Sequence, residues 1–168
     1  MGNLNDFDEA TNNINKNDLV EIDKWIISEA IKLHEEIQEL NDNYAYHHVI
    51  QKIHNFCVHE LGGVYLDIIK DRMYVTKSNS NARRSAQFAL FEVADILIRL
   101  ISPVLVFTAE EIWQSHELFK KQSVSIFTAP QKTLSKIESS ISDEDWKKIF
   151  SVKDAVNQSI EKARADSV

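Results

Sequence analysis

The sequence predicts an all-α fold, an antiparallel bundle of about five helices. Three observations support this class. The chain has only 3 Gly and 2 Pro in 168 residues, few for a protein built from turns and short strands. Apolar residues recur at steps of three and four over long stretches, as on one face of a helix. A hydrophobic content of 43% can form the core of one domain of this length. We expect this bundle at residues 17–168.

The first helix follows a polar leader. Residues 1–16 are rich in Asn and Asp and lack apolar periodicity, so we expect a flexible leader there. Asn17 or Asp18 has a side chain suited to capping a helix start. The apolar stripe that predicts the helix consists of Ile22, Ile26, Ala30, Leu33, Ile37 and Leu40.

A long second helix is predicted after the turn signal Asn41-Asp42-Asn43. Its middle holds Gly62 and Gly63, each of which costs about 1 kcal/mol relative to Ala in a helix. We therefore expect a bend or a close helix crossing there. Cys57 falls on the apolar stripe, which predicts a buried thiol. That stripe consists of Ile50, Ile53, Cys57, Leu61, Val64 and Ile68.

Three further helices complete the prediction. The polar connector 78–81 precedes a helix that begins near Ala82 and ends at Ser102-Pro103, because Pro lacks a backbone donor. The run Thr108–Glu111 has the form of a capping box and predicts a fourth helix. The alternating run 123–127 predicts a short extended segment. Residues 142–145 open a last helix.

Charge limits the nucleic-acid contacts that this chain can make. Its formal net charge is −7, and neutralising phosphate requires Lys and Arg where contact occurs. Any RNA contact must therefore be local. The basic stretch 70–84 is the candidate, since Arg offers two parallel donors to phosphate and a planar face for stacking on an unpaired base. The same side chains also suit ordinary ion pairs on solvated helix faces. The candidate RNA-binding residues are Lys70, Arg72, Tyr74, Lys77, Arg83 and Arg84.

Several classes of catalytic and metal site lack their motifs. A single cysteine permits no intramolecular disulfide and no thiolate zinc cluster, and it fits a reducing cytoplasm. The histidines lack the i, i+4 spacing that places two imidazoles on one helix face. Glycine-rich phosphate loops and nucleophile elbows are also missing. We therefore expect no catalytic residue, metal ligand or cofactor in this chain. Its most apolar window is broken by Arg99 and Pro103, so we expect no membrane contact.

Two other kinds of function stay open on the residues alone. The first is an acidic helical module that binds another protein through Trp25, Trp113 or Trp146, without RNA. The second is a small helical metalloenzyme, for which the chain lacks suitable ligands.

Several blocks of sequence resemble one known domain when taken together. They are Asp23–Ile26, Asn55–Cys57, Tyr65–Arg72, Arg83–Gln87, Pro103–Trp113 and Val156–Arg164. This order is similar to the anticodon-binding helix bundle of class I isoleucyl-tRNA synthetases, and the run Tyr-Leu-Asp-Ile-Ile-Lys-Asp-Arg is particular to the isoleucine enzymes. The resemblance spans residues 18–168. The chain departs from it at Leu61-Gly62-Gly63-Val64, where the family usually has Leu-Ser followed by Phe.

The resemblance implies recognition of the anticodon stem-loop of isoleucine tRNA by a piece of a larger enzyme. The implied parent charges isoleucine onto its tRNA with ATP and magnesium, and such enzymes commonly carry zinc in a C-terminal module. The signatures for adenylate formation are absent here, so the chain alone is expected to have no catalytic or editing site. The implied partners are isoleucine tRNA and the catalytic domain of the parent, in the cytoplasm.

Overall fold

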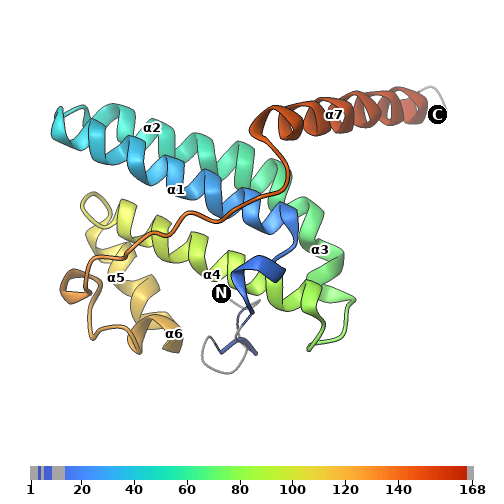
Figure 1. Cartoon of the computed structure of the whole chain (residues 1–168). Helices are drawn as coiled ribbons and strands as arrows, with labels where there is room; N and C mark the ends of the chain where they lie inside the picture. Colours follow the sequence, from blue (N-terminus) through green and yellow to red (C-terminus); the bar gives the residue numbers. More distant parts are fainter. Residues whose placement is uncertain (1–3, 5, 9–13, 166–168) are drawn as a thin grey trace. The chain divides into compact units, whose positions relative to one another are not determined.

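The computed structural model describes Leu4, residues 6–8 and residues 14–165 (Figure 1). These residues form helices and no strand, which confirms the all-α prediction. In chain order the elements are η2 (Lys16–Asp18), α1 (Glu21–Asp42), α2 (Tyr46–Phe56), the π-helix η3 (Cys57–Leu66), α3 (Asp67–Tyr74), α4 (Asn81–Ile101), α5 (Val106–Ser115), α6 (Glu117–Lys120), η4 (Ile126–Thr128) and α7 (Asp143–Ala165).

The chain forms two compact units, Met1–Glu138 and Ser139–Val168, where the sequence predicts one bundle over residues 17–168. The predicted flexible leader belongs to the first unit. Its residues 1–3, 5 and 9–13 lie outside the described residues. Among the described ones, Leu4 and Phe7 are 3% and 5% exposed, so this part of the leader packs against the bundle. The sequence missed that packing because two apolar residues are too few to form a periodic pattern.

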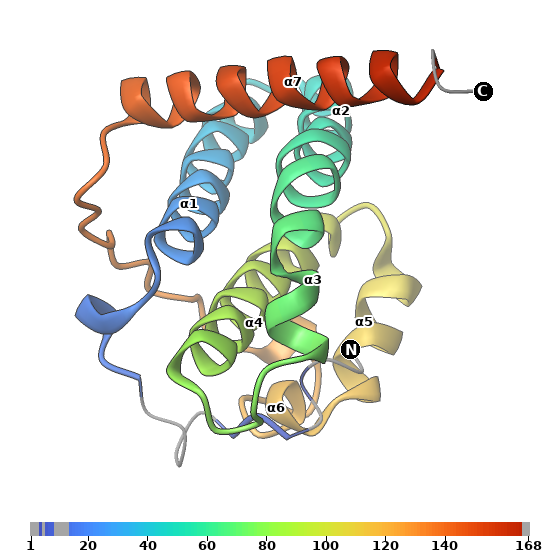
Figure 2. The same cartoon turned by 90° about the vertical axis from the view of Figure 1, so that its right-hand side faces the viewer.

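The core of the first unit lies between α1 and α4. Figures 1 and 2 show α1 beside α2 and across α4. The predicted stripe on α1 is largely right, since Ile26, Ala30, Leu33 and Ile37 are all buried. The other long helix, α4, is buried on several faces because α1, α3 and α5 all contact it. Ser80 caps α4 by accepting a hydrogen bond from the backbone N–H of Arg83 at 3.3 Å.

Helices α2, η3 and α3 form one continuous helical rod from residue 46 to residue 74. The predicted long helix is therefore present, but its glycines mark a π-helix. A Cβ on Gly62 would lie 2.9 Å from the carbonyl oxygen of Cys57, and one on Gly63 would lie 3.2 Å from that of Val58. Because glycine has no side chain, the wider turn can bring these two carbonyl oxygens close to Gly62 and Gly63.

The π-helix also rotates the buried face of the rod, because it adds residues to each turn. Part of the predicted stripe is therefore wrong: Cys57, within the π-helix, is exposed rather than buried, and Ile68, beyond it, is 39% exposed. Ile50, on α2 before the π-helix, is also exposed, at 43%. Ile53 is buried as predicted, and the other buried side chains of the rod are Val49, Phe56, Tyr65, Ile69 and Met73.

An aromatic cluster joins α4, α5 and α6 to the N-terminal segment. The ring of Phe91 lies 6.1 Å from that of Phe7 and 5.5 Å from that of Phe119. Phe119 in turn lies 5.3 Å from Trp113, whose indole N–H donates to the carbonyl of Ser123 at 2.9 Å. Such offset aromatic pairs add stability beyond their buried area.

Two local predictions near α5 are wrong. Thr108 does not cap the helix, which begins two residues earlier at Val106 with no side-chain cap. The run 123–127 is not extended throughout: Ser125 is extended, but η4 begins at Ile126. The carboxylate of Glu110 accepts hydrogen bonds from Ser125 Oγ at 2.8 Å and from the backbone N–H of Ile126 at 3.1 Å. These tertiary contacts replace the expected local ones.

The segment after η4 is held against α4 by ion pairs to a buried carboxylate. Asp95, 1% exposed, accepts from Arg99 Nε at 2.8 Å and from Lys132 Nζ at 2.7 Å. Arg99 also donates to the carbonyl of Pro130 at 2.8 Å. Because Arg99 and Lys132 both pair with the Asp95 carboxylate, this irregular segment has a defined path along the helix.

The second unit contains α7, which begins at Asp143, within the predicted opening 142–145. Ser142 Oγ accepts from the backbone N–H of Asp145 at 3.2 Å. Acidic residues fill the first turn of α7, and Lys162 and Arg164 lie in its last turn, an arrangement that complements the helix dipole.

Two wider features concern the described residues as a whole. Among the described residues, no helix is both long and apolar enough to cross a membrane. The same residues contain no group of three or more His, Cys, Asp or Glu side chains placed to hold a metal ion.

Candidate nucleic-acid interface

The six predicted RNA-binding residues lie at one end of the first unit, where the connector 75–80 joins α3 to α4 (Figure 2). Lys70, Arg72 and Tyr74 are on α3, Lys77 is on the connector, and Arg83 and Arg84 are on the first turn of α4.

The connector is a tight, hydrogen-bonded turn. Thr76 Oγ1 accepts from Ser80 Oγ at 3.2 Å and donates to the backbone carbonyl of Arg72 at 2.6 Å. The backbone N–H of Ser80 donates to the carbonyl of Lys77 at 2.9 Å. These bonds fix the end of α3 relative to the start of α4, so the side chains between them have a defined setting.

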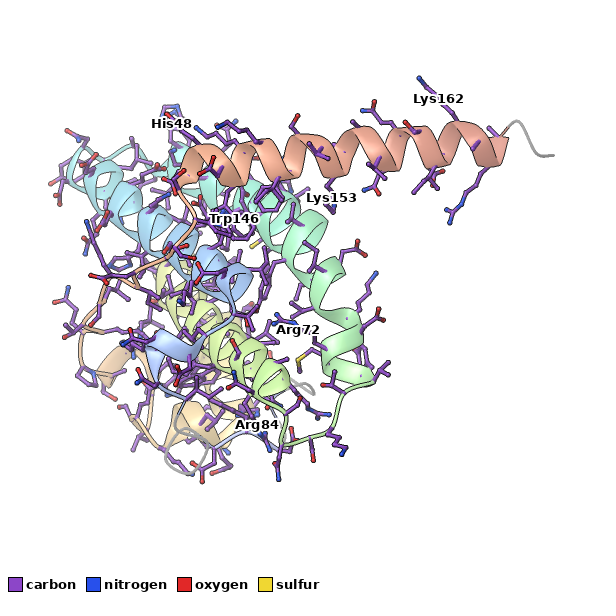
Figure 3. All side chains as sticks on the ribbon, turned by 45° about the vertical axis from the view of Figure 1, so that its right-hand side comes forward. His48, Arg72, Arg84, Trp146, Lys153 and Lys162 are labelled. Atoms are coloured by element: carbon purple, nitrogen blue, oxygen red, sulfur yellow. The ribbon has the colours of Figure 1, made fainter. Side chains whose placement is uncertain are left out.

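Arg72 points into the bundle rather than toward solvent (Figure 3). Its guanidinium donates to both carboxylate oxygens of Asp23, at 3.0 and 2.5 Å, and the side chain is only 18% exposed. Asp23 is fully buried and also accepts from Tyr65 Oη at 2.8 Å and Ser85 Oγ at 2.5 Å. Arg72 therefore joins α3 to α1 inside the protein, away from the surface that RNA would reach.

Burial changes the pKa of the Tyr65 phenol in this network. Burial of Tyr65, followed by the charge and hydrogen bond of Asp23, raises the pKa of the phenol well above its ordinary value of 10.0. The phenol is therefore a neutral donor to the carboxylate at physiological pH.

Arg83 and Arg84 are also engaged by a carboxylate, that of Asp6 in the N-terminal segment. Arg83 Nη2 lies 3.1 Å and Arg84 Nη1 3.6 Å from Asp6 Oδ2. The two guanidinium side chains are 21% and 11% exposed. Asp6 was not among the sequence-derived candidates because it lies in the leader. The apolar residues Leu4 and Phe7 on either side of it were the available signal that this segment packs.

The remaining three candidates face solvent. Tyr74 is 74% exposed, and its neighbour Val75 is 78% exposed. Lys77 is exposed, and no ion pair to it occurs within residues 14–165 or the described part of the leader. Lys70 is 64% exposed and pairs with Asp67 at 2.6 Å; that hydrogen bond, with the charge of Asp67, raises the pKa of the lysine.

This surface combines an accessible aromatic ring with exposed positive charges on α3 and on the turn that follows it. An exposed ring can stack on an unpaired base, and a lysine without a partner can approach a phosphate with no carboxylate to displace. We call Lys70, Tyr74 and Lys77 the connector surface. Its chemistry suits single-stranded nucleic acid, which presents both unstacked bases and phosphates.

Comparison with known proteins identifies the family. A model described as the anticodon-binding domain of tRNA ligase matches residues 23–168. An isoleucine–tRNA ligase from Pseudoalteromonas translucida (strain TAC 125) is 43% identical over 170 residues, covering 100% of this chain and 18% of the relative. The isoleucine–tRNA ligases of Pseudomonas aeruginosa (strain LESB58) and Teredinibacter turnerae (strain ATCC 39867 / T7901) are 43% and 41% identical, covering 98% and 100% of this chain and 18% of each relative.

The chain thus spans less than a fifth of the length of these relatives. The match to the family model, in contrast, includes α1 from Asp23 onward, all later helices and the connector surface. The chain therefore belongs to the anticodon-binding domain family of tRNA ligases.

Proposed function

We propose that this chain recognises the anticodon stem-loop of isoleucine tRNA as one domain of an isoleucine–tRNA ligase. The observation that carries the proposal is the match of residues 23–168 to the anticodon-binding domain. The isoleucine assignment rests on relatives that are 41–43% identical along essentially the whole chain. The complete ligase would act in the cytoplasm and use ATP with magnesium, and zinc in a further module, through parts outside this chain.

Within this function, we assign first contact with the RNA to the connector surface. Lys77 would meet a phosphate, Lys70 would support it, and Tyr74 would stack on an unpaired base. This differs from the expectation that all six basic and aromatic candidates touch RNA, because Arg72 holds α3 to α1 through the buried Asp23. Phosphate contacts of this kind position the nucleic acid, whereas base contacts distinguish one tRNA from another.

The test is a fluorescence titration of the purified chain with isoleucine tRNA and with a second tRNA, at 50 and 200 mM salt. Loss of stacking in Tyr74→Ala should weaken binding by about 1–3 kcal/mol. Lys77→Glu should weaken binding to both tRNAs and reduce the salt slope by about 1.

The matched control is Lys52→Glu. Lys52 is 44% exposed, lies on α2 in the same unit and pairs with Glu36 at 2.5 Å. The substitution reverses the same charge on α2, a different helix from those that the connector joins. Equal losses in Lys77→Glu and Lys52→Glu would remove the connector surface from the proposal. Salt-independent behaviour with no preference between tRNAs would contradict the proposed function itself.

A further inference from the structure

The carboxylate of Asp6 is held by three donors from the first two turns of α4. Gln87 Nε2 donates to Oδ1 at 2.6 Å, and Arg83 Nη2 donates to both oxygens, at 3.3 and 3.1 Å. Arg84 Nη1 lies 3.6 Å from Oδ2 and donates to the main-chain carbonyl of Asp6 at 2.6 Å. One anionic group therefore receives two guanidinium groups and an amide.

Two of the three donors, Arg84 and Gln87, also make contacts that do not depend on the carboxylate. Gln87 is completely buried, and its Oε1 accepts from Arg84 Nη1 at 2.7 Å. Arg84 Nη2 donates to Asn79 Oδ1 at 2.9 Å. The Nε atoms of Arg83 and Arg84 are buried without a hydrogen-bond partner, so both guanidinium groups have donor capacity that the present contacts leave unused. A preorganised set of donors at the start of a long helix favours an anion, and Arg is well suited to phosphate.

The N-terminal segment has other anchors. Leu4 and Phe7 are buried, and the ring of Phe7 packs near that of Phe91. Asp6 itself is more accessible, with a side chain 39% exposed. Burial alone would raise the pKa of Asp6, but the hydrogen bond from Gln87 and the charges of Arg83 and Arg84 outweigh burial and lower that pKa. The carboxylate is therefore a charged occupant at the protein surface, on a segment fixed by its apolar neighbours.

We propose that Arg83, Arg84 and Gln87 form a phosphate site whose present occupant is the Asp6 carboxylate, and that a backbone phosphate of the bound RNA displaces it. The inference rests on the proposed function, because it takes the RNA to be the tRNA. The site begins three residues after Ser80, at the end of the connector, so it continues the connector surface along the chain. Figure 3 shows Arg84 at this start of α4. Asp6 thus limits the affinity for RNA until a phosphate takes its place.

The test compares Asp6→Asn with Asp8→Asn by the same tRNA titration. Asp8 is a matched control because its side chain is 41% exposed, lies in the same segment and pairs at 3.8 Å with Lys121, which is not one of the three phosphate-site residues. Both variants remove one negative charge, so they share any long-range effect on RNA. We expect Asp6→Asn to bind tRNA on the order of tenfold more tightly than Asp8→Asn at 50 mM salt. One additional phosphate contact should shrink that advantage about threefold at 200 mM salt.

A second measurement uses inorganic phosphate and no RNA. Phosphate should raise the melting temperature of Asp6→Asn above that in chloride of equal ionic strength, and it should not do so for Asp8→Asn. Adding Arg83→Gln to Asp6→Asn should abolish both the phosphate effect and the gain in tRNA affinity. The melting curves also show whether each variant is folded. A loss of tRNA binding caused by misfolding is therefore distinguished from a loss of the phosphate site.

The outcomes separate the two proposals. If the unaltered chain binds tRNA but Asp6→Asn binds no better than Asp8→Asn, the phosphate site is overturned while the proposed function stands. If no variant binds tRNA, the proposed function is overturned, and with it the assignment of RNA to this site. Tighter, salt-sensitive binding by Asp6→Asn alone supports the site.

Discussion

Replacing Asp23 with Ala should destabilise the first unit far more than its single charge suggests. The carboxylate is 0% exposed and accepts from Tyr65, Arg72 and Ser85. Its loss leaves two buried hydroxyl groups without an acceptor, at about 1 kcal/mol each. It also leaves the Arg72 guanidinium, 18% exposed, without its counter-charge. Removing one partner of a buried ion pair costs about 3–5 kcal/mol, which we take as the expected total because the penalties overlap.

Urea and thermal unfolding followed by tryptophan fluorescence measure this loss. For a chain of this size, about 3–5 kcal/mol corresponds to a melting temperature lower by roughly 6–20 °C. The control is Glu36→Ala, which breaks a pair of the same 2.5 Å length, to Lys52, between side chains that are 52% and 44% exposed. An exposed pair is worth about 0–1 kcal/mol.

A double-mutant cycle with Arg72→Met tests the physical reason. If the contributions of Asp23 and Arg72 to stability depend on one another, Arg72→Met should lower the free energy of unfolding less in the Asp23→Ala background than in the unaltered chain. A cost of Asp23→Ala no larger than that of Glu36→Ala, or additive losses in the cycle, would refute the reasoning.

Three further predictions follow from single residues. The pKa of Tyr65 is higher in the folded chain than in the unfolded one, so the stability that the neutral phenol contributes is complete below pH 10 and is lost as the pH rises further. In Tyr65→Phe the free energy of unfolding should therefore depend less on pH in the alkaline range, as measured by urea unfolding at several pH values. Gly62→Ala should lower the melting temperature, because its Cβ would lie 2.9 Å from a backbone oxygen, whereas a gain of about 1 kcal/mol would mean that the π-helix relaxes to an α-helix. Cys57 is exposed and should react with a thiol reagent without denaturant, but more slowly at neutral pH than a free thiol, since the neighbouring protein partly desolvates the thiol and raises its pKa.

Much of the fold could be predicted from local sequence because helix signals act over short distances. The stripe on α1, the cap at Ser80 and the end of α4 before Pro103 all depend on residues within about a turn of one another. The same kind of reasoning failed at η3, where the apolar residues fit an unbroken α-helix although the backbone adopts a wider turn. Periodicity assumes a constant number of residues per turn, and that assumption does not hold across Gly62 and Gly63.

The sequence by itself determined the helical class, most helix positions and the motifs that match the anticodon-binding family. Only the tertiary structure decided which basic residues face solvent. Arg72 and Arg83 are charged residues on helices, yet their carboxylate partners lie 49 and 77 residues away along the chain. No local pattern specifies such partners, because they meet only when α1 and the N-terminal segment pack against α3 and α4. Packing therefore leaves Lys70, Tyr74 and Lys77 as the exposed candidates for RNA.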